Sequence, residues 1–263
     1  MLEDKSPEFW NLLNRDAKVE KVASGFTFTE GPVFSRRGYL LFSDIPANRI
    51  QKWERGELTT VRENSNKANG NTFDHQGRLL TAEGGGKVTR TEKDGSITVL
   101  ASQGLEGPND LVYCIDGSIY FTDLPKSKVY RISRKGQIEV VTEECAGPNG
   151  VALGPNQQLL YVADVKKQIV RAYDIKPDGK LANGRDFAPV RTDGLKTDEG
   201  GNVWMASRDG VYVYSAAGKH LGIVRTPEGP SNNCWGNGFA GMYITARTSV
   251  YHVPTKAHGT RTF

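Results

Sequence analysis

Six positions along the chain carry oxygen-bearing side chains that could bind a metal ion or a polar substrate, and they recur at a nearly constant interval. Successive members are 39, 40, 40, 44 and 39 residues apart. They are Glu30, Asn69, Asn109, Asn149, Asp193 and Asn232. Two carboxylates and four amides, with no His or Cys, suit hard cations such as Ca²⁺, Mg²⁺ or Mn²⁺ better than zinc. Two carboxylates close together would repel unless a cation or a proton lay between them.

Each position also has a purely local interpretation. Asn and Asp favour turns, and Asn69, Asn149 and Asp193 are each followed by Gly, which makes a common turn dipeptide. For any single position, the turn interpretation is favoured. The set of six favours a ring of ligands, provided that the fold brings all of them to one place.

A repeat of about 40 residues indicates a fold that would do so. A short apolar strand follows each oxygen-bearing position, and the ends of these strands are 39, 40, 41, 43 and 39 residues apart. The strands are Tyr39–Asp44, Gly77–Glu83, Gly117–Asp123, Gln158–Asp164, Gly201–Ser207 and Gly241–Ala246. Six such units predict an all-β fold, a six-bladed β-propeller with four-stranded antiparallel blades. Equivalent positions of the blades then lie at one height around the central channel.

The N-terminal segment precedes the first repeat unit. Residues 1–16 are predicted to form an extension in which Pro7–Asn14 is a short helix. Lys18–Ser24 is rich in β-forming residues and has no partner nearby, so about residues 17–24 are predicted to supply the outer strand of the last blade. Residues 1–263 are therefore expected to form a single propeller domain.

Composition excludes several classes of function. Lys and Arg number 34 against 30 Asp and Glu, and no run of like charges predicts a nucleic-acid or membrane partner. No apolar stretch of about 18 residues is present, so no transmembrane helix is expected. The N-terminus has no signal-peptide core, but a start Met could replace a cleaved signal, which leaves cytoplasmic and periplasmic or secreted locations open. The expected partner is a small molecule, bound by a monomer or a small homo-oligomer.

The motifs around the six positions resemble those of the gluconolactonase / senescence-marker-protein / luciferin-regenerating-enzyme family, and the bacterial gluconolactonase branch in particular. The similar stretches are EGPVF, SDIPANRI, NGNTFDHQGRLLTAE, GPNDLV, DGSIYFTD, GPNGVALGPNQQLLYVAD, DGLKTDEGGNVW and YITA. They run from about Ala23 to Val253. The resemblance implies a six-bladed propeller with one metal ion on its axis. It also implies hydrolysis of aldonolactones or, in some branches, of other lactones or organophosphate esters.

The resemblance assigns roles by motif. It implies that Glu30, Asn149 and Asp193 are the protein ligands of the metal and that Asn109 contacts the substrate. Asp193 also resembles the family's proposed general base and is the predicted catalytic residue. The metal is expected to be Ca²⁺, with Mg²⁺, Mn²⁺, Zn²⁺ and Fe²⁺ as alternatives. Before the Pro-Asn-Asp motif the chain has Gly104–Gly107 in place of a basic and a polar residue, which leaves the choice of sugar open.

The predicted reaction is the opening of a small lactone, an aldonolactone such as gluconolactone. The metal would polarise the carbonyl group while Asp193 accepts a proton from water. Asn109, Asn69 and Asn71 are predicted to hydrogen-bond sugar hydroxyls or the developing oxyanion. Trp235 is predicted to line the site, with core packing as an equal alternative. Two other functions stay open: a non-catalytic, metal-containing binding propeller, and an organophosphate or other ester hydrolase at the same site.

Overall fold

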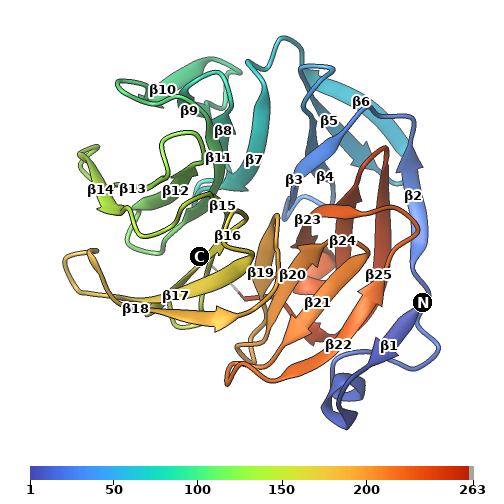
Figure 1. The fold of residues 1–263 in the computed structure, drawn as a ribbon. Coiled ribbons are helices and arrows are strands. Elements are labelled where there is room, and N and C mark those ends of the chain that lie inside the picture. The colour runs from blue at the N-terminus through green and yellow to red at the C-terminus, as the bar shows by residue number, and fades with distance from the viewer. Residues whose placement is uncertain (261–263) are drawn as a thin grey trace.

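The strands of the chain form six separate antiparallel sheets arranged as a ring around a central channel (Figure 1). The structure is a computed structural model, and it describes residues 1–260. Within that range, five sheets have four strands and one has five. The prediction of an all-β, six-bladed propeller with four-stranded antiparallel blades is thus confirmed. Residues 1–260 contain no helix long and apolar enough to cross a membrane.

The first three blades each consist of four consecutive strands that run from the channel outward. Blade one contains β3 (Thr29–Phe34), β4 (Leu40–Asp44), β5 (Arg49–Glu54) and β6 (Glu57–Arg62). Blade two contains β7 (Ala68–Phe73), β8 (Leu79–Glu83), β9 (Lys87–Thr91) and β10 (Ile97–Ala101). Blade three contains β11 (Pro108–Tyr113), β12 (Ile119–Asp123), β13 (Lys128–Ile132) and β14 (Ile138–Thr142).

The last three blades follow the same plan, but two of them gain a strand from the N-terminus. Blade four contains β15 (Pro148–Leu153), β16 (Leu159–Asp164), β17 (Ile169–Ile175) and β18 (Leu181–Ala188). Blade five contains β19 (Leu195–Thr197), β20 (Val203–Ser207), β21 (Gly210–Tyr214), β22 (His220–Arg225) and β1 (Leu2–Asp4). Blade six contains β23 (Pro230–Trp235), β24 (Ala240–Ala246), β25 (Ser249–His258) and β2 (Glu20–Ser24).

The apolar interior lies between neighbouring blades rather than in the channel. All residues of β4, β8, β12, β20 and most of β16 and β24 are buried. These second strands have blades on both sides, which explains why their sequences are continuous apolar runs rather than alternating ones. Cys114, Cys145 and Cys234 are buried in this interior as free thiols.

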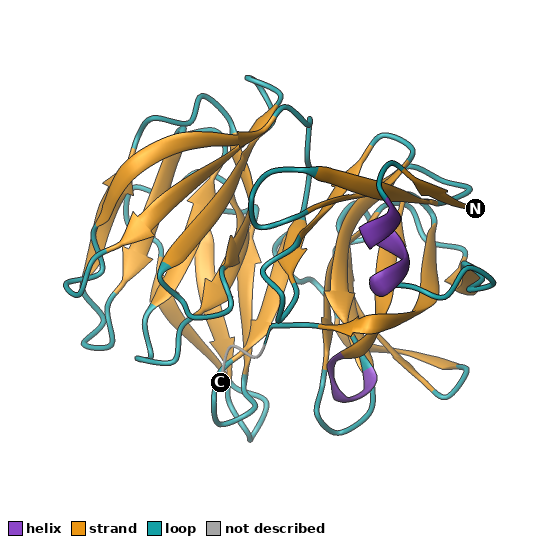
Figure 2. Ribbon diagram, turned by 90° about the horizontal axis from the view of Figure 1, so that it is seen from below, coloured by secondary structure: helices purple, strands orange, loops and turns teal. Residues whose placement is uncertain are grey.

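The predicted helix at Pro7–Asn14 is wrong. In its place is η1 (Pro7–Asn11), one short 3₁₀ segment at the edge of the ring (Figure 2). The Ser6 side chain bonds to Glu8 instead of capping the backbone of the turn. So short a segment forms too few backbone hydrogen bonds to offset the free-energy cost of nucleating an α-helix. Burial of Phe9 against blade five holds the segment in place instead. A second 3₁₀ segment, η2 (Asn237–Phe239), precedes β24.

The ring closes where β2 pairs with β25. The register runs antiparallel from Glu20 opposite His252 to Ser24 opposite Ser249. Glu228, in the loop between β22 and β23, ties this junction together. Its carboxylate accepts hydrogen bonds from the Thr248 backbone N–H at 2.9 Å and the Tyr251 hydroxyl at 2.8 Å, and others from the Thr248 and Ser249 hydroxyls. Lys21 Nζ of β2 lies 3.3 Å away.

Loss of the Glu228 carboxylate should weaken this junction. Burial raises the pKa of Glu228, but hydrogen bonds from Ser249, Tyr251 and Thr248 outweigh it and lower the pKa to about 2. Glu228→Gln is expected to reduce the free energy of unfolding by about 1–3 kcal/mol at neutral pH, as for hydrogen bonds to a charged group. Because the folded pKa lies below the unfolded one, this contribution is present above about pH 4.5 and is lost as the pH falls toward about 2.

Urea unfolding of wild type and Glu228→Gln at several pH values measures this effect. The difference between the two proteins should shrink steadily below about pH 4.5. Glu143→Gln is the control, because Glu143 is 61% exposed and makes a surface ion pair with Lys128; it should change stability by less than about 1 kcal/mol. A Glu228→Gln difference independent of pH would contradict the argument.

Candidate active site at the channel mouth

The innermost strands of the six blades pack against one another in sequence around the channel. β3, β7, β11, β15, β19 and β23 each contact the next, and β23 contacts β3 (Figure 1). The oxygen-bearing positions lie where these strands begin, at the end of the channel that we call the mouth. Glu30, Asn69, Asn109 and Asn149 are each the second residue of their strand, Asn232 is the third, and Asp193 lies two residues before β19.

Strand irregularities at the mouth turn these side chains out of the regular ladder. The pairing of the innermost strand with its neighbour shifts register just past the oxygen-bearing residue in blade one, across that residue in blades two to four, and immediately before it in blade six. The shifts lie between Glu30 and Val33, Ala68 and Asn71, Pro108 and Leu111, Pro148 and Val151, and Pro230 and Asn232. Such irregularities re-aim side chains next to functional sites.

The glycines that follow the oxygen-bearing residues are explained by contact between blades, not only by turns. A Cβ on Gly31 would lie 1.9 Å from the Asn69 carbonyl oxygen, and one on Gly194 would lie 2.0 Å from the Asn232 side chain. Gly70 and Gly150 face the next blade in the same way. The missing side chains let each blade approach its neighbour closely enough to bring the ring of oxygens together.

Five side chains meet at the mouth, and we call them the oxygen cluster: Glu30, Asp110, Asn149, Asp193 and Asn232. The Asn232 amide donates to Glu30 Oε2 at 2.9 Å and to Asp110 Oδ2 at 3.4 Å. Asn149 donates a hydrogen bond to the Asp193 carboxylate. The structure therefore brings together Glu30, Asn149 and Asp193, the three predicted metal ligands.

The carboxylates of the cluster perturb one another. Burial raises the pKa of Glu30 well above its usual range, and the negative charges of Asp193 and Asp110 raise it further. Burial also raises the pKa of Asp193 to about 6, although Arg191 and Asn149 act in the opposite direction. Protons or a cation must balance this concentration of negative charge. A raised pKa on a carboxylate beside a cleft is also a feature of groups that transfer protons.

Two cluster contacts were missed by reasoning from the sequence. Asp110 is buried and directly follows Asn109. In most blades a glycine follows the oxygen-bearing residue, so this departure from the repeat could have drawn attention to Asp110. Lys196 Nζ lies 3.9 Å from Asp110 Oδ2 and 3.4 Å from Asn232 Oδ1. No feature of the repeat singles out Lys196.

The predicted substrate-binding asparagines lie in different settings. Asn109 and Asn69 are partly exposed at the mouth. Asn71 is buried, and its amide donates to the Gly31 carbonyl, the Ser43 hydroxyl and the Asn69 carbonyl at 2.9–3.0 Å. Its polar groups are thus used in joining blades one and two, while contact with substrate stays a prediction for all three residues.

Trp235 does not join the oxygen cluster. It is the last residue of β23, so the strand carries it away from Asn232 toward the opposite end of the channel. Its indole N–H donates to the Thr197 carbonyl at 2.8 Å, and its ring packs edge-to-face against Trp204 at 5.2 Å. The sequence around Asn232 is typical of a turn at the mouth, but pairing with β24 makes Pro230–Trp235 a continuous strand.

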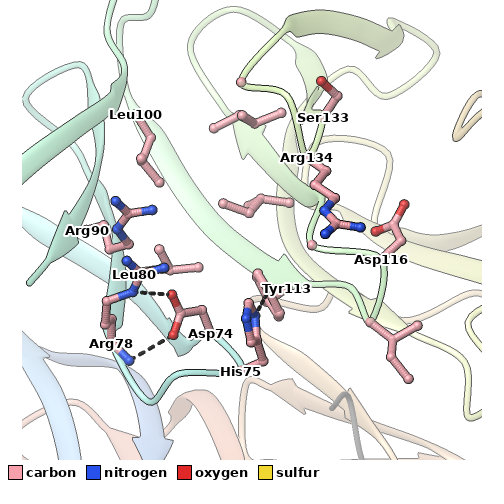
Figure 3. A pocket seen from close by; sticks show the side chains of 15 residues that line it. Asp74, His75, Arg78, Leu80, Arg90, Leu100, Tyr113, Asp116, Ser133 and Arg134 are labelled. Atoms are coloured by element: carbon pink, nitrogen blue, oxygen red, sulfur yellow. Dashed lines mark hydrogen bonds and ion pairs between the residues drawn. The ribbon is translucent and has the colours of Figure 1, made fainter.

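A hollow of about 410 Å³ opens at the mouth, and Asp193 forms part of its wall. A different hollow, of about 370 Å³, lies between blades two and three at the far ends of their inner strands (Figure 3). Most of its polar groups are paired: Arg78 Nε donates to Asp74 at 2.7 Å, and His75 Nδ1 lies 2.5 Å from the Tyr113 hydroxyl. Of the two, only the first combines open space with the oxygen cluster.

The family described as the SMP-30/Gluconolactonase/LRE-like region matches residues 28–248. The chain belongs to this family. The matched region begins just before Glu30 and ends beyond Asn232, so it includes the whole oxygen cluster.

Individual proteins of known sequence or structure are also similar to this chain. A gluconolactonase of Zymomonas mobilis is 27% identical over 305 aligned positions, covering 97% of this chain and 86% of the relative. The structure of a gluconolactonase from Xanthomonas campestris superposes with a TM-score of 0.90 at 29% identity, covering 97% of this chain and 94% of that one. Regucalcin from Agrobacterium tumefaciens, a calcium-binding protein, shares the fold with a TM-score of 0.81 at 15% identity, covering 94% and 96%.

The residues at the mouth fit a divalent cation by their chemistry. Within residues 1–260 there is no group of three or more His, Cys, Asp or Glu side chains arranged to hold a metal. The candidate set here is two carboxylates, Glu30 and Asp193, with the Asn149 amide, all oxygen donors of the kind that Ca²⁺ prefers. With all three carboxylates ionised, Glu30, Asp110 and Asp193 together with Lys196 would carry a net charge of −2, which one divalent cation would balance.

Proposed function

We propose that the chain is a metal-dependent lactonase that opens a small sugar lactone, an aldonolactone such as gluconolactone. The observation that carries this proposal is the meeting of Glu30, Asn149 and Asp193 beside an open hollow at the mouth. Membership of the family and similarity to two gluconolactonases support lactone hydrolysis as the reaction.

Glu30, Asn149 and Asp193 would hold the cation, with Ca²⁺ as the proposed ion. When bound, it would polarise the lactone carbonyl and make a nearby water more acidic. Asn232 orients Glu30 through its amide, and Lys196 offsets part of the charge of Asp110. These contacts would hold the ligands in position before substrate arrives.

Asp193 is the proposed general base. It is partly exposed and lines the hollow, so a water molecule there could donate a hydrogen bond to it. In the proposed step Asp193 takes a proton from that water while the water oxygen bonds to the carbonyl carbon. The ring C–O bond then breaks, and the proton returns from Asp193 to the departing alkoxide, which leaves a hydroxy acid. Asn109 and Asn69, at the same mouth, would donate hydrogen bonds to the sugar.

A lactone screen with and without metal tests the proposal. The purified protein should hydrolyse aldonolactones of five or six carbons above the spontaneous rate, lose this activity after treatment with chelator, and regain it on addition of Ca²⁺ or another divalent ion. Aryl phosphotriesters form a parallel arm for the ester-hydrolase alternative. Absence of lactone hydrolysis at every metal tested would contradict the proposal and favour a binding propeller.

A further inference from the structure

Three exposed arginines from three separate segments surround the hollow at the mouth. Arg191 precedes Asp193 in the segment that enters blade five, Arg208 lies in the turn between β20 and β21, and Arg247 lies in the turn between β24 and β25. All three line the same hollow of about 410 Å³ that Asp193 lines. The sequence separates them by up to 56 residues, and the packing of blade five against blade six brings them together.

Within residues 1–260, none of these guanidinium groups forms a salt bridge, although the charge of Arg191 acts on Asp193. In the part of the chain that the structure describes, no carboxylate forms a salt bridge within 4.0 Å of Arg191, Arg208 or Arg247. Elsewhere arginines are paired, as Arg62 is with Glu83 at 2.6 Å and Arg225 with Glu3 at 2.6 Å. Three guanidinium groups line this hollow against the single carboxylate of Asp193, so the excess of positive charge would bind an anion favourably.

The backbones that carry these arginines are anchored. The Arg191 carbonyl accepts a hydrogen bond from the Ser207 hydroxyl at 2.8 Å, and the Arg247 carbonyl accepts one from the Thr29 N–H at 2.7 Å. Gly229 packs so closely that a Cβ there would lie 2.7 Å from the Arg208 carbonyl oxygen. Only the long side chains need to be ordered when a ligand binds, which reduces the entropic cost.

A neutral sugar lactone gives Arg208 and Arg247 no role, since its hydroxyl groups can be bound by the amides at the mouth. We infer that the substrate carries an anionic group, a phosphate ester or a carboxylate, that Arg191, Arg208 and Arg247 bind while the lactone ring lies at the oxygen cluster. This inference rests on the proposed function and narrows it to anionic lactones. A planar guanidinium forms paired hydrogen bonds with either oxyanion, and a volume of about 410 Å³ is that of a typical small-ligand pocket.

The test compares three lactones that differ only at the far end of a six-carbon chain: a neutral aldonolactone, its 6-phosphate and the corresponding 6-carboxylate. Wild type should prefer one of the anionic lactones by at least about 10-fold in kcat/KM, and the better anion identifies the group. Arg208→Gln and Arg247→Gln should each lower kcat/KM for that lactone by roughly 10- to 100-fold. For the neutral lactone, kcat/KM should stay within about 2-fold, because its contacts do not involve these charges.

Arg134→Gln is the matched control. Arg134 is also an exposed arginine, but it lines the hollow at the far end of the channel (Figure 3). This variant should leave all three rates unchanged. Added salt should lower kcat/KM for the anionic lactone in wild type, because it screens the attraction between the charges. The decrease should be much smaller in the Arg208→Gln and Arg247→Gln variants.

A binding measurement separates failure of this inference from failure of the proposed function. A six-carbon polyol 6-phosphate should raise Tm of wild type, the polyol itself should not, and Arg208→Gln and Arg247→Gln should reduce the shift. If no lactone is hydrolysed but this pattern holds, the proposed reaction is wrong and the anion site is right. If the neutral lactone is preferred, or if the arginine variants affect all lactones equally, the anion site is wrong and lactone hydrolysis stands.

Discussion

Asp193→Asn is expected to retain metal at saturating concentration and yet to lose roughly 10²–10⁴-fold in kcat, the usual contribution of a general base. Asparagine has nearly the same shape as aspartate and keeps one oxygen that can bind the metal. The loop should keep its fold, because the backbone of residue 193 forms hydrogen bonds with Ala206 and Gly150. The substitution removes the group that can accept a proton and one ligand charge, which is why the comparison is made at saturating metal. The measurement is kcat on an aldonolactone at increasing metal concentration, with bound metal determined on the same samples.

The outcome distinguishes two roles for Asp193. If kcat returns to the wild-type value once the variant is saturated with metal, Asp193 is a ligand and another group is the base. If kcat stays low with metal bound, Asp193 accepts the proton. Asp116→Asn serves as the control, because Asp116 lies at the far end of the channel, where it pairs with Arg131 at 3.5 Å. It should leave kcat unchanged.

Glu30→Gln is expected to weaken metal binding by about 10²-fold or more, because the number of ligand charges largely sets the affinity of oxygen-ligand sites. In the metal-free protein, by contrast, the substitution should increase stability. Burial, Asp193 and Asp110 all raise the pKa of Glu30, which means that its negative charge is unfavourable there without a cation. Glu30→Gln should therefore raise Tm of the metal-free protein while reducing the increase in Tm that metal produces in wild type.

Calorimetric titration with Ca²⁺ and thermal unfolding with and without chelator measure both effects. The glutamine can still accept hydrogen bonds from Asn232 and from the Gly31 N–H, so the variant should fold. Glu83→Gln provides a comparison at another buried carboxylate, one that pairs with Arg62 instead of facing the cluster. It should lower stability without changing metal affinity. An unchanged affinity in Glu30→Gln would show that Glu30 is not a ligand.

The part of the site that could be predicted is the part that repeats. Glu30, Asn149 and Asp193 occupy one position of a 40-residue unit, and in a ring of equal blades one position means one height on the axis. The family resemblance selected these three from the six candidates, and the structure places them together. Asp110 and Lys196 do not follow the repeat, so their approach to the cluster depends on packing between blades three, five and six.

The number of blades, the four-strand plan and the place of the oxygen-bearing residue in each unit could be predicted from the sequence, because each depends on a local pattern repeated six times. Three other features follow from tertiary contacts alone: Pro7–Asn11 is a 3₁₀ turn, β1 joins blade five, and Trp235 faces away from the mouth. Each of these depends on one contact with a distant strand rather than on local preference. The same holds for Arg191, Arg208 and Arg247, which are exposed residues outside the strands and share a hollow only because blades five and six pack side by side.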